Sequence, residues 1–366
     1  MLTINLAAIQ ENWKTLCSMT SAKVAGVIKA DAYGLGASEV GAALYDAGCR
    51  EFFVASLDEG MSARNYLPSD TVIYVLGGIR LGDEQNFVDA NLIPVLCSVT
   101  ELKRWAHFNS KLGAIAPSAI KLNSGMTRLG IDIHDLEMLC NDKDLIIACN
   151  PVLLMSHLAC AEDPEHPLNM FQLFNFRKGV EEIRRLFPNI RLSLANSSGI
   201  FLGTSWHFDL VRPGAALYGI APQIDQPNPT KPVVRLTLPI IQVRKLSDAA
   251  SLGYGAEAVL PKESRIAIAV GGYADGINRT LGRNPEGIIC GHNVYSVGRI
   301  SMDVTMFDVS DVPLSDEQIL NSHVEVINEK FSLDYLSRKN KALGYEVLTS
   351  LGSRYKRKYL GRNNGR

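Results

Sequence analysis

The sequence has almost no net charge and no long apolar run. Its 366 residues contain 37 Lys plus Arg against 38 Asp plus Glu, a formal charge of −1. This balance gives no electrostatic reason to expect a nucleic acid or an anionic membrane as a partner. The longest apolar candidate, from Leu145 to Leu158, is interrupted by Asn150 and Pro151, and it is shorter than the roughly 18 residues that cross a bilayer. The composition therefore indicates a globular protein.

Disulfide, zinc and export patterns are also missing. The seven Cys are odd in number and show no Cys-x-x-Cys spacing, which is typical of reduced thiols. The first residues, MLTINLAAIQENWK, have no basic segment before an apolar one, unlike a secretion signal. No metal site is expected, because five His lie in polar segments without i,i+4 pairing: His134, His166, His207, His292 and His323. We expect a cytoplasmic protein.

Short apolar segments recur through the first two thirds of the chain. They are Val24–Ile28, Phe52–Ala55, Val72–Leu76, Ile93–Cys97, Ala119–Leu122, Val152–Met155, Ile190–Leu194 and Asp209–Val211. Between them lie segments with helical apolar spacing, such as Val40 to Ala47 and Met170 to Leu186. This alternation predicts parallel βαβ units. Eight repeats over about 220 residues favour an α/β fold of the (β/α)8 TIM-barrel type over a doubly wound sheet, and we expect the barrel to span residues 1–225.

The composition changes after the segment PQIDQPNPTKP, whose Pro and Asn content suits a linker. Four alternating, β-branched runs follow: Val233–Val243, Arg265–Val270, Val294–Val309 and Val324–Ile327. They predict a mainly β C-terminal domain over residues 226–366, with a little helix near its end. The basic run from Arg354 to Lys358 is expected to be a solvated end of the chain.

Polar side chains follow the predicted barrel strands at their carboxyl ends, where barrel enzymes place their active sites. They are Lys29, Lys121, Arg128, His157, Asn196, Ser197 and Arg212. Lys29 follows the apolar AGVI, and desolvation there would lower its pKa and make the amine nucleophilic toward an aldehyde. The segments ANSSG and RPGAALYG offer hydroxyls and backbone N–H groups that can bind phosphate. A reactive lysine beside a phosphate site suggests pyridoxal phosphate.

Eight motifs of this chain resemble those of the alanine racemase family, in the family's order. They are AGVIKADAYG at 25–34, KLNSGMTRLG at 121–130, SHLACAED at 156–163, ANSSG at 195–199, RPGAALYG at 212–219, LGYGA at 252–256, GGYADG at 271–276 and GRISMD at 298–303. The resemblance runs from Leu2 to Arg357. It implies a pyridoxal-phosphate isomerase that interconverts L- and D-alanine as a homodimer and supplies D-alanine for peptidoglycan.

The resemblance also implies roles for particular residues. Lys29 would hold the cofactor as an aldimine and serve as one base, and Tyr254 of the partner subunit would serve as the opposing base. Racemisation needs two such bases because the proton leaves one face of Cα and returns on the other. The cofactor would be held by Lys29, Tyr33, His157, Asn196, Ser197, Arg212, Gly214 and Ala215. The substrate side would be formed by Arg128, Tyr273, Met302 and Asp303, and Lys121 would be carbamylated on Nζ.

Three positions depart from the family pattern. Asn123-Ser124 replaces a more frequent Asp-Thr, Ser193 stands where some members have His, and Ser353 stands where some have a phosphate-binding Tyr. We expect altered charge near Lys121, one supporting hydrogen bond lost at Ser193, and no phosphate contact from Ser353. Three other functions stay open: a barrel-type pyridoxal-phosphate decarboxylase, a broad-specificity racemase, and a non-catalytic carrier of the cofactor that consists of the barrel alone.

Overall fold

The chain is divided into two compact units. The computed structural model describes residues 1–113, 115–277 and 285–361. The barrel unit comprises Ile9–Leu217 and Ala221–Lys231, and the C-terminal unit comprises Met1–Ala8, Tyr218–Ile220 and Pro232–Arg366. We expected residues 1–225 to form the barrel. The first eight residues belong to the C-terminal unit instead, because their backbone pairs with strands there.

Short parallel strands form the barrel unit. They are β2 (Lys23–Val24), β3 (Gly26–Val27), β4 (Glu51–Val54), β5 (Val72–Val75), β6 (Ile93–Leu96), β7 (Ser118–Lys121), β8 (Pro151–Met155), β9 (Arg191–Ser193) and β10 (Leu210–Val211). Strands β3 to β9 form one sheet in chain order, and β10 pairs with β2, which directly precedes β3. Backbone hydrogen bonds of 3.0 Å, from Asp209 to Leu192 and from Arg212 to Ala195, link β10 to β9. The ring of strands is therefore closed, and the predicted barrel fold is confirmed.

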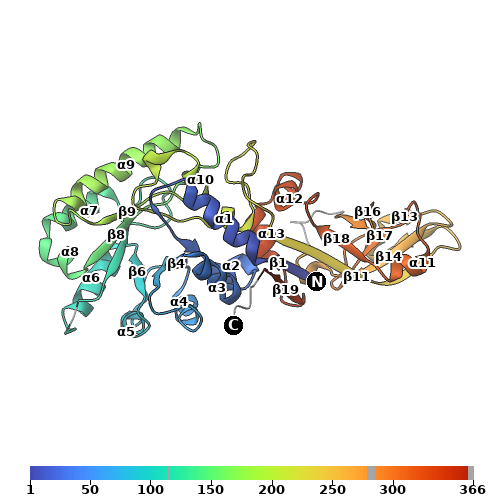
Figure 1. Ribbon diagram of the computed structural model, residues 1–366, viewed down its shortest axis with the longest axis horizontal. Helices are drawn as coiled ribbons and strands as arrows, with labels where there is room; N and C mark the ends of the chain where they lie inside the picture. Colours follow the sequence, from blue (N-terminus) through green and yellow to red (C-terminus); the bar gives the residue numbers. More distant parts are fainter. Residues whose placement is uncertain (114, 278–284, 362–366) are drawn as a thin grey trace. The chain divides into compact units, whose positions relative to one another are not determined.

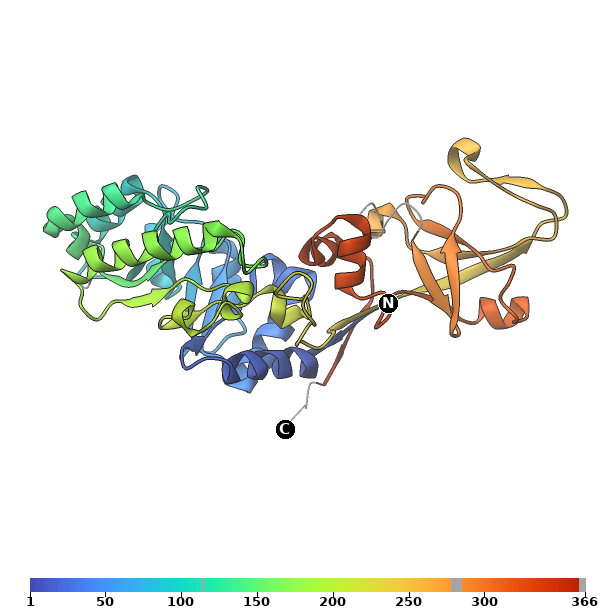
Figure 2. The ribbon, with the colours of Figure 1, turned by 90° about the horizontal axis from the view of Figure 1, so that it is seen from above.

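Helices alternate with these strands and lie outside them (Figures 1 and 2). They are α1 (Leu6–Ser18), α2 (Lys29–Gly34), α3 (Ala37–Ala47), α4 (Leu57–Ala63), α5 (Glu84–Asp89), α6 (Val99–Asn109), α7 (Ile133–Asn141), α8 (Lys143–Ala148), α9 (Pro167–Arg184) and α10 (Ser197–Ile200), with the 3₁₀ turns η1 (Thr204–Trp206) and η2 (Ala215–Tyr218). Their ends follow local signals. Gly48 at φ 113° closes α3, and Pro167 occupies the first turn of α9.

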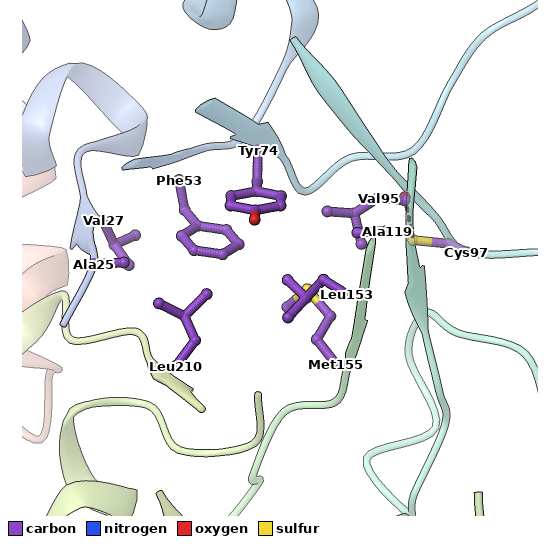
Figure 3. Packing of buried hydrophobic residues seen from close by; sticks show 10 residues of the cluster. All are labelled: Ala25, Val27, Phe53, Tyr74, Val95, Cys97, Ala119, Leu153, Met155 and Leu210. Atoms are coloured by element: carbon purple, nitrogen blue, oxygen red, sulfur yellow. Dashed lines mark hydrogen bonds between the residues drawn. The ribbon is translucent and has the colours of Figure 1, made fainter. Parts of the chain in front are cut away.

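Apolar side chains from successive strands fill the centre of the barrel (Figure 3). The cluster consists of Ala25, Val27, Phe53, Tyr74, Val95, Cys97, Ala119, Leu153, Met155 and Leu210. The rings of Phe53 and Tyr74 stack with their centroids 4.6 Å apart. Burial of such a side chain stabilises the fold by about 1.5–3 kcal/mol. Because the centre is packed with apolar groups, the polar side chains that follow the strands gather at the strand ends.

The C-terminal unit is mainly antiparallel. Its strands are β1 (Leu2–Asn5), β11 (Val234–Lys245), β12 (Ala250–Leu252), β13 (Ala258–Leu260), β14 (Arg265–Val270), β15 (Glu286–Ile289), β16 (His292–Ser296), β17 (Val304–Asp308), β18 (His323–Ile327) and β19 (Arg357–Leu360). Their order is β14-β17-β16-β15-β18-β11-β1-β19, and the long β11 also pairs with β14. Six strands therefore close into a ring. Short helices complete the unit: α11 (Asp316–Leu320), α12 (Leu333–Asn340), α13 (Gly344–Ser350), η3 (Tyr254–Ala256) and η4 (Tyr273–Asp275).

Two expectations for the C-terminal unit are wrong. The run Val294–Val309 is not one strand, because a loop that carries the GRISMD motif separates β16 from β17. The basic run that starts at Arg354 is not a solvated end. Arg354 forms ion pairs with Asp275 and Asp303, and β19 pairs in parallel with β1.

Candidate functional site

The turn that follows β3 carries Lys29 and has an unusual hand. Ala30, Asp31, Ala32 and Tyr33 have φ between 51° and 58°, so α2 is a left-handed turn built from non-glycine residues. Lys29 directly precedes these four residues, and Tyr33 is the last of them. Four consecutive L-residues thus adopt the left-handed conformation that glycine usually supplies.

The Lys29 amine lies in an environment that favours its neutral form. Burial lowers the pKa of Lys29, and the positive charge of Arg128 lowers it further, whereas the carboxylate of Glu59 acts in the opposite direction. The net shift is downward. A lysine with a lowered pKa has more neutral amine at physiological pH, which is the nucleophilic form.

Further cationic groups lie at the same rim. Lys121, at the end of β7, is 6% exposed. Burial lowers the pKa of Lys121, and the positive charges of Arg128, Arg212 and Lys29 lower it further, whereas Cys97 acts in the opposite direction. His157 follows β8, and burial and the same cationic groups hold its pKa well below the usual range. His157 is therefore neutral at physiological pH. Residues predicted from separate strand ends thus share one electrostatic environment.

Arg212 is anchored at the end of β10. Its guanidinium donates hydrogen bonds to the carbonyl oxygens of Ser156 (2.5 Å) and Leu194 (3.4 Å), and Nη2 lies 3.4 Å from Nδ1 of His157. Arg212 is 4% exposed, and burial lowers its pKa to about 9. It therefore remains protonated at neutral pH, with a fixed orientation.

Ser193 supports Arg212 directly. We expected a supporting hydrogen bond to be missing here, but the hydroxyl of Ser193 accepts one from Arg212 and donates another to the carbonyl of Leu210 at 2.5 Å. Ser193 is fully buried. Ser193 therefore holds the buried guanidinium of Arg212 in a fixed orientation.

The predicted phosphate ligands lie together near the start of η2. The hydroxyl oxygen of Ser197 accepts hydrogen bonds from the backbone N–H groups of Gly214 (3.0 Å) and Ala216 (3.1 Å). Gly214 also lies against Tyr33, because a Cβ atom on Gly214 would overlap the hydroxyl of Tyr33. A larger residue at position 214 would displace the Tyr33 hydroxyl, and Tyr33, Ser197 and Gly214 form a small polar cradle.

Two other predicted ligands flank the cradle. Asn196 is the N-cap of α10, and its Oδ1 accepts a hydrogen bond from Gly199 N–H at 2.9 Å. That oxygen is therefore engaged in a helix cap. Ala215 directly follows Gly214 and begins η2, so it can offer only its backbone and methyl group.

Tyr254 lies in the C-terminal unit, in η3 at the tip of the β12–β13 hairpin. It is 70% exposed. The flanking Gly253 and Gly255 have φ of 68° and 73°, a conformation that glycine adopts without strain. The sequence therefore places a tyrosine hydroxyl on a tight, protruding turn.

The remaining predicted substrate residues come together elsewhere in the C-terminal unit. Backbone hydrogen bonds of 3.1 Å join Tyr273 to Ser301 and Ala274 to Met302. The side chains of Tyr273 and Met302 are about half exposed. Asp303 accepts a hydrogen bond from Nη1 of Arg354 at 2.7 Å.

Several supporting residues of the site could not be predicted from the motifs of the sequence. The carboxylate of Glu59 accepts hydrogen bonds from the backbone N–H groups of Ala30 and Ala55. The Ser-x-x-Glu pattern that starts at Ser56 could have indicated the start of a helix here. Gln172 binds the loop after β8 through the carbonyl of His157 (2.8 Å). Arg354 binds Asp275, 79 residues away, and no local pattern indicates such a pairing.

The chemistry of the barrel rim fits pyridoxal phosphate. The rim combines a desolvated amine, a cradle of hydroxyls and backbone groups, and buried cations that suit an anionic ligand. Within residues 1–113, 115–277 and 285–361, no three His, Cys, Asp or Glu side chains are grouped so that they could hold a metal. No helix in those ranges is long and apolar enough to cross a membrane.

A closed parallel barrel with a lysine-centred cationic rim, joined to a mainly antiparallel β unit, defines a two-domain barrel enzyme. The family model of the alanine racemase N-terminal domain matches residues 4–222, and that of the alanine racemase C-terminal domain matches residues 233–359. The chain belongs to the alanine racemase family and is an amino-acid racemase. Both domains match, which disfavours the decarboxylase and the barrel-only carrier.

Curated relatives resemble the chain over nearly its whole length. An alanine racemase of Rhodospirillum rubrum is 44% identical, and the match covers 100% of this chain and 97% of the relative. Agrobacterium fabrum has a biosynthetic alanine racemase that is 40% identical, covering 98% and 93%, and a catabolic one that is 39% identical, covering 98% and 92%. Identity to named relatives therefore does not separate a biosynthetic from a catabolic role.

Solved structures have the same fold. The alanine racemase of Bartonella henselae, which contains covalently bound pyridoxal phosphate, is 35% identical with a TM-score of 0.92, covering 98% of this chain and 99% of that one. The biosynthetic alanine racemase of Pseudomonas aeruginosa is 30% identical with a TM-score of 0.86, covering 99% of both chains.

Proposed function

We propose that the protein interconverts L- and D-alanine with pyridoxal phosphate attached to Lys29. The observation that carries this proposal is the half-buried Lys29 amine at the barrel rim, whose lowered pKa suits attack on an aldehyde, in a member of the alanine racemase family. The covalent cofactor of the Bartonella henselae relative supports the same group here. We further propose that the enzyme works in the cytoplasm as a homodimer and supplies D-alanine for peptidoglycan.

Pyridoxal phosphate, when bound, withdraws electrons from the amino-acid Cα and so makes its proton removable. The phosphate would be held by Tyr33, Ser197 and the backbone at Gly214 and Ala215. Asn196 would also belong to the cofactor site, and His157 would link Arg212 to Tyr254. Arg212, protonated and fixed by Ser156 and Leu194, would face the pyridine nitrogen. A guanidinium does not give up its proton at neutral pH, so it leaves that nitrogen unprotonated.

Two bases would move the proton. Lys29 would act from one face of Cα and Tyr254 of the partner subunit from the other. The high exposure of Tyr254 on its own chain supports a role in a partner's site. A tyrosine serves as a base only near cations, and Arg128 would supply that charge while binding the substrate carboxylate. Tyr273, Met302 and Asp303 would shape the substrate side.

Lys121 would be modified by carbon dioxide. Its lowered pKa keeps part of the amine neutral, which is the form that attacks carbon dioxide, forming an N–C bond and releasing one proton. The resulting carbamate would be an anion facing Arg128 and Arg212. Asn123, where many members have Asp, donates a hydrogen bond to Asp132 (2.8 Å) and accepts from the Thr127 N–H (3.0 Å). It therefore shapes the loop that carries Arg128 without adding charge.

The direct test of the reaction is chiral chromatography of alanine. Purified protein with added pyridoxal phosphate should convert L-alanine into an equal mixture of both enantiomers, because the enantiomers have equal free energy. Lys29→Ala should produce no D-alanine above the uncatalysed background. If the cofactor-loaded wild type forms no D-alanine, the proposed function is wrong.

Subunit mixing tests the shared site. Lys29→Ala and Tyr254→Phe chains each lack one base in every site of their own homodimers. In a mixed dimer one site contains both defects and the other contains neither. At equal input, activity should recover to roughly a quarter of wild type, by the symmetry of a two-fold dimer. Activity that stays at the mutant background, with exchange verified by mass-tagged chains, would place both bases on one chain.

A further inference from the structure

The left-handed turn after Lys29 requires support from its surroundings. L-residues disfavour positive φ because Cβ approaches the following carbonyl oxygen, yet Ala30 to Tyr33 all adopt it. Within the turn, Ala32 N–H donates to Ile28 O at 2.9 Å, and Gly36 N–H donates to Asp31 O at 2.9 Å. These bonds close the turn locally but leave the first N–H, that of Ala30, to be satisfied from outside.

Glu59 supplies that external partner. Its Oε1 accepts a hydrogen bond from Ala30 N–H at 2.8 Å, and its Oε2 accepts one from Ala55 N–H at 2.6 Å. Glu59 lies in the first turn of α4, where Ser56 is the N-cap and accepts from Glu59 N–H at 3.3 Å. One carboxylate therefore joins the residue after Lys29 to the end of the neighbouring strand β4.

A second glutamate of the barrel, Glu101, binds two backbone N–H groups in the same way. Ser98 caps α6, and Oε2 of Glu101 accepts from Cys97 N–H at 2.5 Å. Glu101 also accepts from the backbone N–H of Ile79, in the loop after β5. Each glutamate therefore accepts one hydrogen bond from the residue just before the N-cap of its own helix. It accepts a second one from a residue that follows the neighbouring strand, β3 for Glu59 and β5 for Glu101. Glu101 is a natural control, because its second partner lies in a loop without a reactive lysine.

Charge adds to the effect of Glu59. Its carboxylate raises the pKa of Lys29, against the lowering by burial and Arg128. Glu59 thus acts on Lys29 both through the backbone of Ala30 and through space. Within the described residues, Glu101 is not among the groups that shift the pKa of Lys29.

We propose that Glu59 is a positioning residue for Lys29: its carboxylate holds the left-handed turn and thereby fixes where the Lys29 amine emerges at the rim. The consequence for catalysis rests on the proposed function, whereas the structural part does not. In Glu59→Gln the side chain keeps its length, but only its oxygen can accept from an N–H, and its NH₂ faces the other donor. One of the two backbone bonds is therefore lost.

Hydrogen exchange tests the structural part without any catalytic readout. The full-length chain is compared as wild type, Glu59→Gln, Glu59→Asp and Glu101→Gln, with and without pyridoxal phosphate. We expect amide exchange in peptides that cover residues 29–36 to be at least tenfold faster in Glu59→Gln and in Glu59→Asp, whose shorter side chain cannot span both N–H groups. Glu101→Gln should accelerate exchange around residues 77–79 and leave residues 29–36 within twofold of wild type.

The rate of covalent capture of pyridoxal phosphate at Lys29 tests the chemical part. It should fall at least tenfold in Glu59→Gln and stay within twofold of wild type in Glu101→Gln. Unchanged exchange at residues 29–36 in both Glu59 variants, or equal effects of Glu59→Gln and Glu101→Gln, would overturn the proposal. If the wild type captures no cofactor at Lys29, the proposed function fails, but the exchange comparison still decides the role of Glu59.

Discussion

Two clusters of charged side chains in this protein are built in opposite ways. At the barrel rim, burial lowers the pKa of both Lys29 and Lys121, and the neighbouring cations lower it further. In the C-terminal unit, the hydrogen bonds that Arg354 donates to the carboxylates of Asp275 and Asp303 raise the pKa of Arg354. The barrel rim thus groups cationic side chains with one another. In the Arg354 cluster, which consists of Arg354, Asp275 and Asp303, two carboxylates of the same chain neutralise the positive charge.

The difference indicates which cluster binds a ligand. Buried positive charges repel one another and destabilise the fold unless an anion joins them. A chain that keeps such a cluster gains from a ligand with negative charge, such as a phosphate. The Arg354 cluster already contains its anions, so it acts as a clamp that ties the loops of Tyr273 and Met302 together.

The largest expected effect concerns Ser193. Ser193→Ala removes the oxygen that accepts from the buried Arg212, and a hydrogen bond to a charged group is worth about 1.5–3 kcal/mol. Ser118→Ala is the matched control, because Ser118 is also fully buried but donates only to the Cys149 carbonyl (2.6 Å). Its loss should cost about 1 kcal/mol. Urea unfolding of both variants measures the difference, and equal losses would show that Arg212 does not depend on Ser193.

The next effect concerns the cradle. Gly214→Ala would push the Tyr33 hydroxyl aside and should weaken the binding of pyridoxal phosphate about tenfold, roughly 1.4 kcal/mol. In a Tyr33→Phe background the obstructing oxygen is absent, so the same substitution should have a clearly smaller additional effect. Equilibrium titration gives the four affinities. Strict additivity of the two substitutions would contradict a contact between these residues.

Much of the barrel and part of the site could be predicted from the sequence. The alternation of apolar segments identified the strands, and strand-end positions identified Lys29, Lys121 and Arg212. The hand of the Ala30–Tyr33 turn could not be predicted, because L-residues in that conformation depend on support from Glu59. The pairing of β1 with β11 and β19 also depends on distant segments, and nothing in residues 2–5 specifies it.

A smaller effect is expected in acid. Burial tends to raise the pKa of Asp275, but hydrogen bonds from Arg354 and from the Gly272 N–H prevail and lower it below 3.8. A carboxyl with a lower pKa in the folded state stabilises the fold above the unfolded value, and this stability is lost as pH falls through the folded value. Wild type should therefore lose more stability below pH 3.8 than Asp275→Asn. Parallel acid dependences, measured by urea unfolding, would contradict the clamp.

The smallest effect concerns the exposed Arg128. Its charge lowers the pKa of Lys29, so Arg128→Ala should shift the pH dependence of cofactor capture by Lys29 toward higher pH. The shift should be small, because exposed charges are screened by water and salt. Arg244→Ala, an exposed position on β11, serves as the control and should leave the profile unchanged. A shift toward lower pH in Arg128→Ala would contradict the assigned influence.

The most direct test of the account is chemical trapping of the cofactor. Protein loaded with pyridoxal phosphate is reduced with borohydride, which fixes the cofactor on its lysine, and the peptides are mapped by mass spectrometry. We predict a pyridoxyl group on Lys29 alone. Lys121 is the sharpest internal control, because it is buried at the same rim and its pKa is also lowered, but it ends β7 and does not start the left-handed turn. A pyridoxyl group on Lys121 or on another lysine would contradict the central claim.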